Sequence, residues 1–449
     1  MYLNRRRFLT LTGRALSSVG TASLLHFNRM SAVAQTTADY RALVCVFLNG
    51  GNDGNNTIVP LAQQEYAAYA ATRGNLALAQ SSLRPVATLD GTRFGLHPHL
   101  AGLQRLFTDR RAAVVANVGM LAQPLTRAQY LARAGAIPQN LYSHADQQIQ
   151  WQAGFPATGA DTGWAGRTAD RLAAANLPND FPVVVSTAGA TVFGFGNRAI
   201  PASVLPGGNS SLEGVENTPA AIARTQALEH LLTLDSGSVL IQAASATTRE
   251  GLRVSRLLDT AMKTRLPLTT PFPQTALGQQ MHEVAKVMQV RHELGVTRQI
   301  FFCNMDGFDT HAGQINTHAG LLKELDSALV ALSDATLELG IDREVTIFTE
   351  SEFGRTLQPS TGAGTDHAWG SHHFVIGGAV RGGEIYGEFP SLALGGPDDA
   401  SGRGVWIPTS SLDQYGATLA AWFGVADQDL PLVFPNLVNF ASPKLGFVG

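Results

Sequence analysis

Short runs of consecutive apolar residues recur along the chain, and segments with apolar residues at three- and four-residue spacing separate them. Runs that are apolar at every position are typical of strands buried on both faces, which form parallel sheets covered by helices. We expect such strands at residues 43–48, 112–118, 183–186, 299–303, 345–349 and 374–377. The sequence therefore predicts an α/β fold in which a mostly parallel sheet has helices on both faces.

The segments between these runs predict the helices. They fall at residues 99–109, 220–233, 275–294, 317–339 and 411–423, each with an apolar stripe at helical spacing. Residues 201–217 are rich in Gly, Pro, Ser and Asn, and a helical stretch without strands follows them up to residue 294. We interpret residues 201–294 as a helical insertion or lobe on one large domain that spans residues 35–449.

Residues 1–34 have the features of an export signal. Residues 4–10 read Asn-Arg-Arg-Arg-Phe-Leu-Thr, which fits the twin-arginine form of such signals. A weakly apolar stretch follows and ends in small residues, so we expect cleavage after Ala34. The alternative is an uncleaved membrane anchor, which Arg14 and Arg29 disfavour. The sequence predicts a periplasmic or secreted protein, exported through the twin-arginine translocase, with no stable membrane span.

Composition narrows the class of partner. The chain has 449 residues, 45% of them hydrophobic, and a formal net charge of −3. A nucleic-acid partner would require a basic face, so we expect a small molecule or an envelope polymer instead. Cys45 and Cys303 both lie in apolar runs, which predicts buried free thiols, and a disulfide is the alternative in an oxidising compartment.

The chemistry is expected where the strands end. In open α/β sheets, ligands bind beyond the carboxyl ends of the strands. Residues 49–56, Asn-Gly-Gly-Asn-Asp-Gly-Asn-Asn, follow the first apolar run, and Asp53 offers a hard oxygen ligand there. The alternative is an ordinary turn, because Gly, Asn and Asp are the usual turn residues.

A second candidate segment follows the run at residues 299–303. It contains Asp306, Asp309 and His311, which offer the oxygen and nitrogen ligands that a divalent transition metal prefers. In the alternative, Asp309 caps a turn and His311 is a solvated loop residue. The segment predicts a metal site on a strand end.

Two further acidic segments point to the same chemistry. Glu350 and Glu352 end an apolar strand, where a buried carboxylate needs a positive partner, either Arg355 in an ion pair or a metal ion. Asp366 and His367 lie in a segment that has three histidines within seven positions. This histidine cluster is the most specific single signal in the sequence.

Ser143 and His144 form the last candidate. Ser143 suits a helix N-cap, and the same position would let its hydroxyl face a metal ion and the positive end of the helix. A serine activated in this way is a competent nucleophile.

Taken together, these segments resemble the family known as domain of unknown function 1501, whose members commonly carry a twin-arginine signal. The matching stretches are residues 48–54, 143–144, 307–311, 351–355 and 365–378. The family is similar to the alkaline phosphatase and sulfatase superfamily, whose members fold as a helix-covered sheet with two metal ions at the strand ends. The resemblance therefore implies an alkaline phosphatase-like fold.

Carried onto this sequence, the resemblance implies two ligand sets. Asp53, Ser143 and Glu352 would serve one divalent ion, such as zinc. Asp309, His311 and His367 would serve the other, with Asp306 as a substitute for Asp309 and Asp366 as a further ligand. Asn49, His144 and Arg355 would bind the substrate.

The sequence departs from the superfamily pattern at one point. Where the superfamily has an Asp-His pair, this chain has Glu352-Phe353, which removes a nitrogen ligand. One ion, two ions or none remain open on this basis. The leading hypothesis is an exported metal-dependent hydrolase of phosphate or sulfate esters with Ser143 as nucleophile. The alternative is a non-catalytic envelope binding or assembly protein with a degenerate site.

Overall fold

A computed structural model describes residues 40–449 except 157–158, 179–180, 208–217 and 235–236. The predicted export signal, residues 1–34, lies outside the described residues. Residues Arg41–Gly449 form one compact unit. Whether the signal is cleaved and where the domain begins stay predictions.

The core of this unit is a nine-stranded sheet with the order β11-β5-β10-β9-β1-β8-β6-β7, in which β12 also pairs with β5. Its strands are β1 (Arg41–Leu48), β5 (Ala112–Gly119), β6 (Val184–Ser186), β7 (Ala202–Ser203), β8 (Arg298–Met305), β9 (Val345–Glu350), β10 (Ser371–Ile376), β11 (Ile385–Tyr386) and β12 (Ser410–Ser411). The six longest of these coincide with the predicted apolar runs to within one residue or contain them, except that β10 begins three residues earlier than predicted. β1, β5, β9 and β10 are buried along almost their whole length. The predicted α/β fold with a mostly parallel sheet is confirmed.

One strand runs against the rest. β1 is parallel to β8 and β9, whereas β10 is antiparallel to both of its neighbours, β9 and β5. Strand direction leaves no mark in an apolar run, so the sequence did not predict this reversal. Its consequence is geometric. The loop that precedes β10 lies at the same edge of the sheet as the loops that follow β1, β8 and β9.

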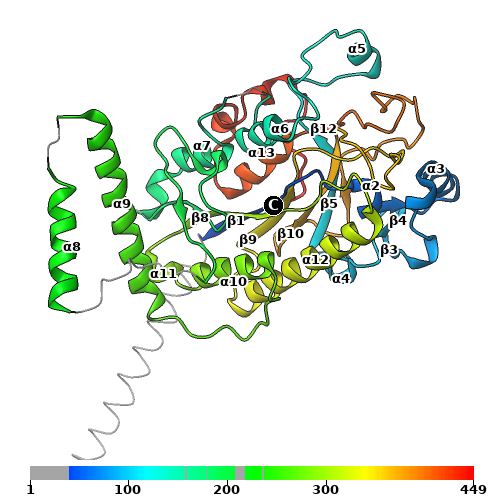
Figure 1. Ribbon diagram of the computed structural model, residues 1–449. Coiled ribbons are helices and arrows are strands. Elements are labelled where there is room, and N and C mark those ends of the chain that lie inside the picture. The colour runs from blue at the N-terminus through cyan, green and yellow to red at the C-terminus, as the bar shows by residue number, and fades with distance from the viewer. Residues whose placement is uncertain (1–39, 157–158, 179–180, 208–217, 235–236) are drawn as a thin grey trace, which may run out of the picture. The chain divides into compact units, whose positions relative to one another are not determined.

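Helices cover both faces of the sheet (Figure 1). α6 (His144–Ala153), α7 (Trp164–Arg171) and α13 (Leu412–Phe423) lie on one face, and α4 (Ala101–Thr108), α10 (Ala276–Gln289) and α12 (Gln314–Glu338) lie on the other. Each of the five predicted helical segments forms a helix, and the segment at 275–294 divides into α10 and α11 (Arg291–Leu294). The remaining long helices are α8 (Pro219–Leu231) and α9 (Val239–Met262), in the predicted helical stretch.

A small antiparallel sheet follows β1 in the chain. It consists of β2 (Ile58–Pro60), β4 (Arg93–Leu96) and β3 (Arg84–Ala87), with α2 (Gly54–Thr57), α3 (Gln63–Arg73) and the short helix α5 (Arg127–Leu131) among the elements outside the main sheet. The sequence analysis missed this sheet because its strands are short and partly exposed. Towards the C-terminus, the short α14 (Leu430–Val433) packs against α13 and α7.

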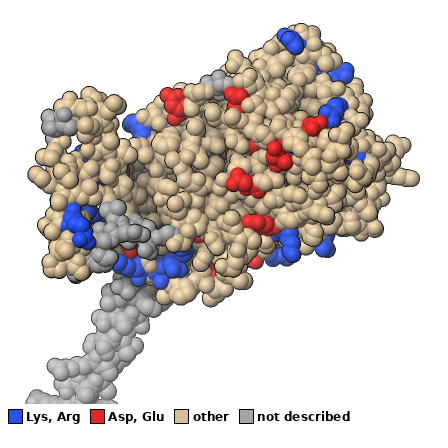
Figure 2. Space-filling view, in the orientation of Figure 1, with Lys and Arg blue, Asp and Glu red and all other residues tan. Residues whose placement is uncertain are grey.

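The apolar core contains both cysteines as free thiols, each fully buried. Burial raises the pKa of the Cys303 thiol to about 12, so the thiol form persists at neutral pH. Among the described residues, no helix is long and apolar enough to cross a membrane. The face of the molecule in Figure 2 is mainly uncharged, with acidic and basic side chains in small separate groups.

Candidate metal centre

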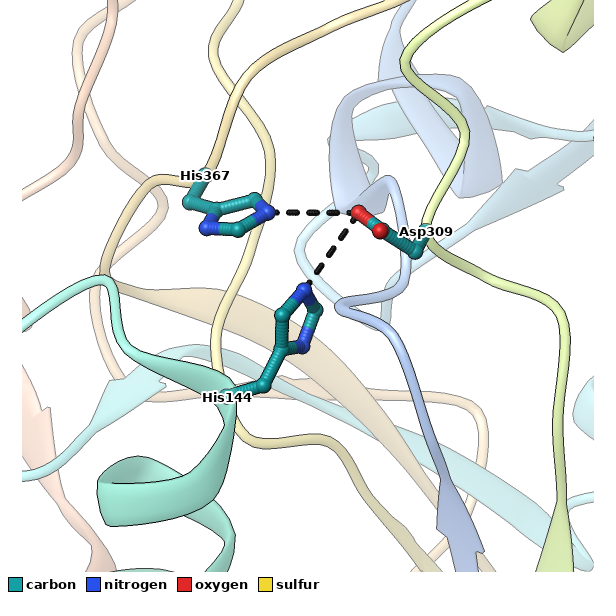
Figure 3. A group of neighbouring side chains, drawn as sticks. All are labelled: His144, Asp309 and His367. Atoms are coloured by element: carbon teal, nitrogen blue, oxygen red, sulfur yellow. Dashed lines mark hydrogen bonds and ion pairs between the residues drawn. The ribbon is translucent and has the colours of Figure 1, made fainter.

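Three side chains from distant parts of the chain meet at the carboxyl edge of the sheet. His144 is the first residue of α6, Asp309 follows β8, and His367 lies in the loop before β10. Their potential ligand atoms all lie within 4.8 Å of one another. Figure 3 shows both imidazole rings pointing at the same carboxylate oxygen.

The distances are those of a tight cluster. Asp309 Oδ1 lies 3.4 Å from His144 Nε2 and 3.2 Å from His367 Nε2. The far nitrogens of both rings are held by other groups, because His144 Nδ1 lies 2.9 Å from Glu352 Oε1 and His367 Nδ1 lies 2.8 Å from the Tyr142 carbonyl oxygen. Both partners only accept hydrogen bonds, so each Nδ1 carries the proton. In a neutral ring the lone pair is then on Nε2, directed at Asp309.

This arrangement fits a cation. Nitrogen lone pairs and a carboxylate oxygen repel one another unless a proton or a metal ion lies between them. Two imidazoles and one carboxylate are a usual ligand set for zinc and similar ions, and such histidines typically donate their other N–H to a carboxylate or a backbone carbonyl. The residues present therefore fit one divalent ion.

His311 adjoins the cluster from its exposed side. Its Nε2 lies 3.0 Å from Asp309 Oδ1 and 2.9 Å from His367 Nε2. On its other side, Nδ1 lies 3.4 Å from Asp366, which pairs with Arg403 at 2.7 Å. His311 is thus placed as a fourth ligand, while Asp366 contacts His311 and not the cluster itself.

Asp309 is the electrostatic centre of the group. Burial alone would raise its pKa, but the Arg355 guanidinium and the neighbouring histidines lower it to about 2. The Glu352 hydrogen bond raises the pKa of His144, and burial lowers the pKa of His367. Asp309 is therefore ionised at neutral pH, and its charge is shared between the Arg355 guanidinium and the histidine side of the cluster.

Arg355 was expected to bind the substrate, but the structure gives it another role. Its side chain is fully buried. It donates to the carbonyl oxygens of Gly51 at 2.9 Å and Thr365 at 2.8 Å, and also to Gly50 O and Asp309. A guanidinium enclosed in this way cannot contact a substrate, so its contacts are those of a residue that positions Asp309.

Glu352 contacts His144 of the cluster but is not one of the three residues whose ligand atoms meet. Its buried carboxylate accepts from the N–H groups of Gly50 at 2.8 Å and Gly51 at 3.2 Å, from Gln148 Nε2 at 3.0 Å, and from His144. Gly50 and Gly51 have φ of 115° and 83°, and a Cβ on Gly50 would lie 2.3 Å from the Asp309 backbone nitrogen. Glycine is therefore required where this loop approaches Asp309.

Asp53 is not brought into the cluster. Both of its carboxylate oxygens pair with the Arg73 guanidinium, and the side chains of both residues are fully buried. It also accepts from the Asn55 N–H at 3.1 Å and from Gln314. Arg73 supplies the positive charge that was expected from a metal ion, so the two ligand sets reduce to one.

The remaining predicted residues make contacts outside the cluster. Ser143 is the N-cap of α6, and its hydroxyl donates to Asp146 Oδ2 at 2.7 Å. Asn49 Nδ2 donates to Asp306 Oδ1 at 2.7 Å, so these two residues partner each other. Asp306 thus contacts Asn49, and Asp309 is the carboxylate of the cluster.

The sequence analysis missed the groups that orient the ligands. Tyr142 has φ of 74°, a conformation that non-glycine residues rarely adopt, and this places its carbonyl at His367. Gln148 and Arg403 were also missed, as was Arg73, the partner of Asp53 outside the cluster. Neither a backbone carbonyl nor a lone arginine or glutamine in a helix leaves a signal in one sequence.

A family model described as "Protein of unknown function (DUF1501)" matches residues 40–399. The chain belongs to this family. No curated protein matches it by sequence.

Solved structures resemble it at 7–10% identity. They include Ps i-CgsB with k-i-k-neocarrahexaose (10% identity, TM-score 0.35, 89% of this chain and 76% of that chain). The PsFucS1 sulfatase from Pseudoalteromonas sp. is another, with 8% identity, a TM-score of 0.33 and coverage of 87% of this chain and 74% of that chain. The lipoteichoic acid synthase LtaP from Listeria monocytogenes has 7% identity, a TM-score of 0.31 and coverage of 83% of this chain and 76% of that chain. At such scores the similarity carries no argument about activity.

Proposed function

We propose that this DUF1501 member is a metal-dependent hydrolase of phosphate or sulfate esters. The observation that supports it is the convergence of His144 Nε2, His367 Nε2 and Asp309 Oδ1, with both rings oriented through Nδ1. These three residues would hold one divalent ion, and His311, beside Asp309 and His367, would be the fourth ligand. A divalent ion in such a site supplies Lewis-acid stabilisation of the charge that develops during ester hydrolysis.

Ser143 is the candidate nucleophile. It precedes His144, and its hydroxyl already donates to Asp146 at 2.7 Å. When Ser143 Oγ forms a bond to phosphorus or sulfur, the bond from that atom to the ester oxygen breaks. The hydroxyl proton passes to Asp146, which returns it to the leaving ester oxygen. Water then hydrolyses the seryl ester. The N-terminus of α6 favours the anionic group of the substrate at this position.

The test is metal content and turnover of the purified chain. We expect about one zinc or similar ion per chain by elemental analysis, and hydrolysis of an aryl phosphate or an aryl sulfate. Asp309→Asn and His367→Ala should lose the metal and the activity. His230→Ala, which removes an exposed histidine of α8, is the matched control and should lose neither.

Ser143→Ala separates the nucleophile from the metal. It should retain the ion and lose turnover by several orders of magnitude. If Ser143→Ala hydrolyses the ester at the wild-type rate, Ser143 is not the nucleophile, and a water molecule takes that role.

The alternative function is a non-catalytic envelope binding or assembly protein. The ion pair between Arg355 and Asp309 favours it, because the guanidinium competes with a cation for the same carboxylate. A purified protein that contains no metal after expression in metal-replete medium would support this alternative.

Export by the twin-arginine translocase and a periplasmic or secreted location belong to the same proposal. The substrate would then be a small-molecule or envelope-polymer ester. Replacing both Arg5 and Arg6 with Lys should leave the protein in the cytoplasm, and fractionation of expressing cells measures this.

A further inference from the structure

A cavity of about 450 Å³ lies at the β6–β7 end of the main sheet and shares no residue with the metal centre. α7, β6 and α9 all contribute to its walls, which are mainly apolar and include Ala169, Phe181, Val184 and Val254. Ligand pockets in proteins occupy roughly 300–1,000 Å³ and are lined in the same way, by apolar side chains with a few polar groups. The cavity therefore has the size and lining of a ligand site.

Gly251 forms part of the wall in the middle of α9. Glycine disfavours a helix relative to alanine, so a glycine inside a helix usually has a packing reason. Here a Cβ would meet nothing within 4 Å, and φ is not in the left-handed region. No protein contact requires glycine at this position. Gly251 thus leaves its part of the cavity wall without a side chain.

The acidic groups of the wall already have partners. The Asp170 carboxylate accepts from the backbone N–H groups of Asn197 at 2.6 Å and Ala199 at 2.8 Å. Glu250 pairs with Arg253 at 2.8 Å. Arg198 differs. Its guanidinium donates a hydrogen bond to the Asp170 carbonyl at 3.3 Å, and the residue is exposed where it lines the cavity. The other N–H groups of this guanidinium can donate to an anion.

Aliphatic side chains are exposed at the cavity and near it in the chain. Ile200 lines the cavity and is 51% exposed, and Leu205, five residues later, is 58% exposed. Exposed aliphatic side chains next to an apolar cavity favour an amphiphile over a fully polar ligand.

We infer that this cavity binds an aliphatic chain with an anionic head group, the chain against Gly251 and the head group at Arg198. The inference does not depend on the proposed hydrolase activity. It requires only that the cavity accept an apolar occupant and that its cationic rim contact the head group.

Calorimetric titration of the full chain with dodecanoate, below its micelle concentration, tests the proposal. We expect saturable binding by the wild type and at least tenfold weaker binding by Gly251→Leu, whose side chain fills the cavity. Gly320→Leu is the matched control, because Gly320 is also helical with nothing within 4 Å of its Cβ position. It should bind dodecanoate like the wild type.

Two further binding measurements test whether the ligand needs an anionic head group. Arg198→Ala should weaken dodecanoate binding about tenfold and leave dodecanol binding unchanged. The proposal is overturned if the wild type shows no saturable binding or if Gly251→Leu binds equally well. Should thermal melting show Gly251→Leu unfolded, Thr247→Phe, which fills the same cavity, replaces it with the same expected result.

Discussion

Glu352→Gln tests the orientation of the metal ligands most directly. The change keeps the volume of the side chain and removes its charge. Glu352 Oε1 accepts from Gly50 N–H, Gln148 and His144 Nδ1, and Oε2 accepts from Gly51 N–H at 3.2 Å. A glutamine oxygen can replace Oε1, but its NH₂ group then faces the Gly51 N–H and leaves that donor unsatisfied.

These contacts determine how much stability and metal affinity the substitution should remove. An unsatisfied buried donor costs about 1–3 kcal/mol, and bonds to a charged acceptor are stronger than those to a neutral one. We expect the free energy of unfolding to fall by about 2–4 kcal/mol. Because Glu352 orients His144 and a neutral amide oxygen accepts more weakly than a carboxylate, metal affinity should fall by about 10–100-fold, the usual effect of mutating the partner of a ligating histidine.

The assays are titration of the metal-free protein with zinc and urea unfolding without metal. Glu338→Gln is the matched control, because Glu338 also accepts from backbone N–H groups, those of Thr269 at 2.7 Å and Thr270 at 2.8 Å, but lies at the end of α12. It should leave zinc affinity unchanged. If Glu352→Gln folds and binds zinc as tightly as the wild type, His144 is not a ligand oriented by Glu352.

Two other predictions concern stability. Arg73→Met leaves Asp53 buried without its charge partner, so urea unfolding should show a loss of about 3–5 kcal/mol, and a loss below about 1 kcal/mol would contradict the buried ion pair. Burial raises the pKa of Asp413 from 3.8 to about 7, so the folded state binds more protons than the unfolded chain between these values. The contribution of Asp413 to stability therefore falls as pH rises from about 4 to about 7. Asp413→Asn should flatten that slope in urea unfolding at pH 5 and pH 7, and an equal slope in both proteins would refute this assignment.

The sequence by itself determined the main strands, most of the long helices and three residues of the metal centre. The apolar runs around Cys45, Val115 and Phe348 are buried strands because no other element buries consecutive apolar residues in so short a length. Asp309 and His367 were predicted as metal ligands because their residue types and positions at strand ends suit a cation. His144 was predicted at the same edge, but as a substrate-binding residue.

Only the tertiary structure decided which polar groups share a site. The reversal of β10 brings His367 to the edge where Asp309 lies, and strand direction is set by packing and connections, not by the composition of the strand. Asp53 does not join the cluster because its carboxylate pairs with Arg73, which lies twenty residues later on α3. A single sequence shows which residues are charged. Which of them pair with one another depends on distances between segments that are remote in the chain.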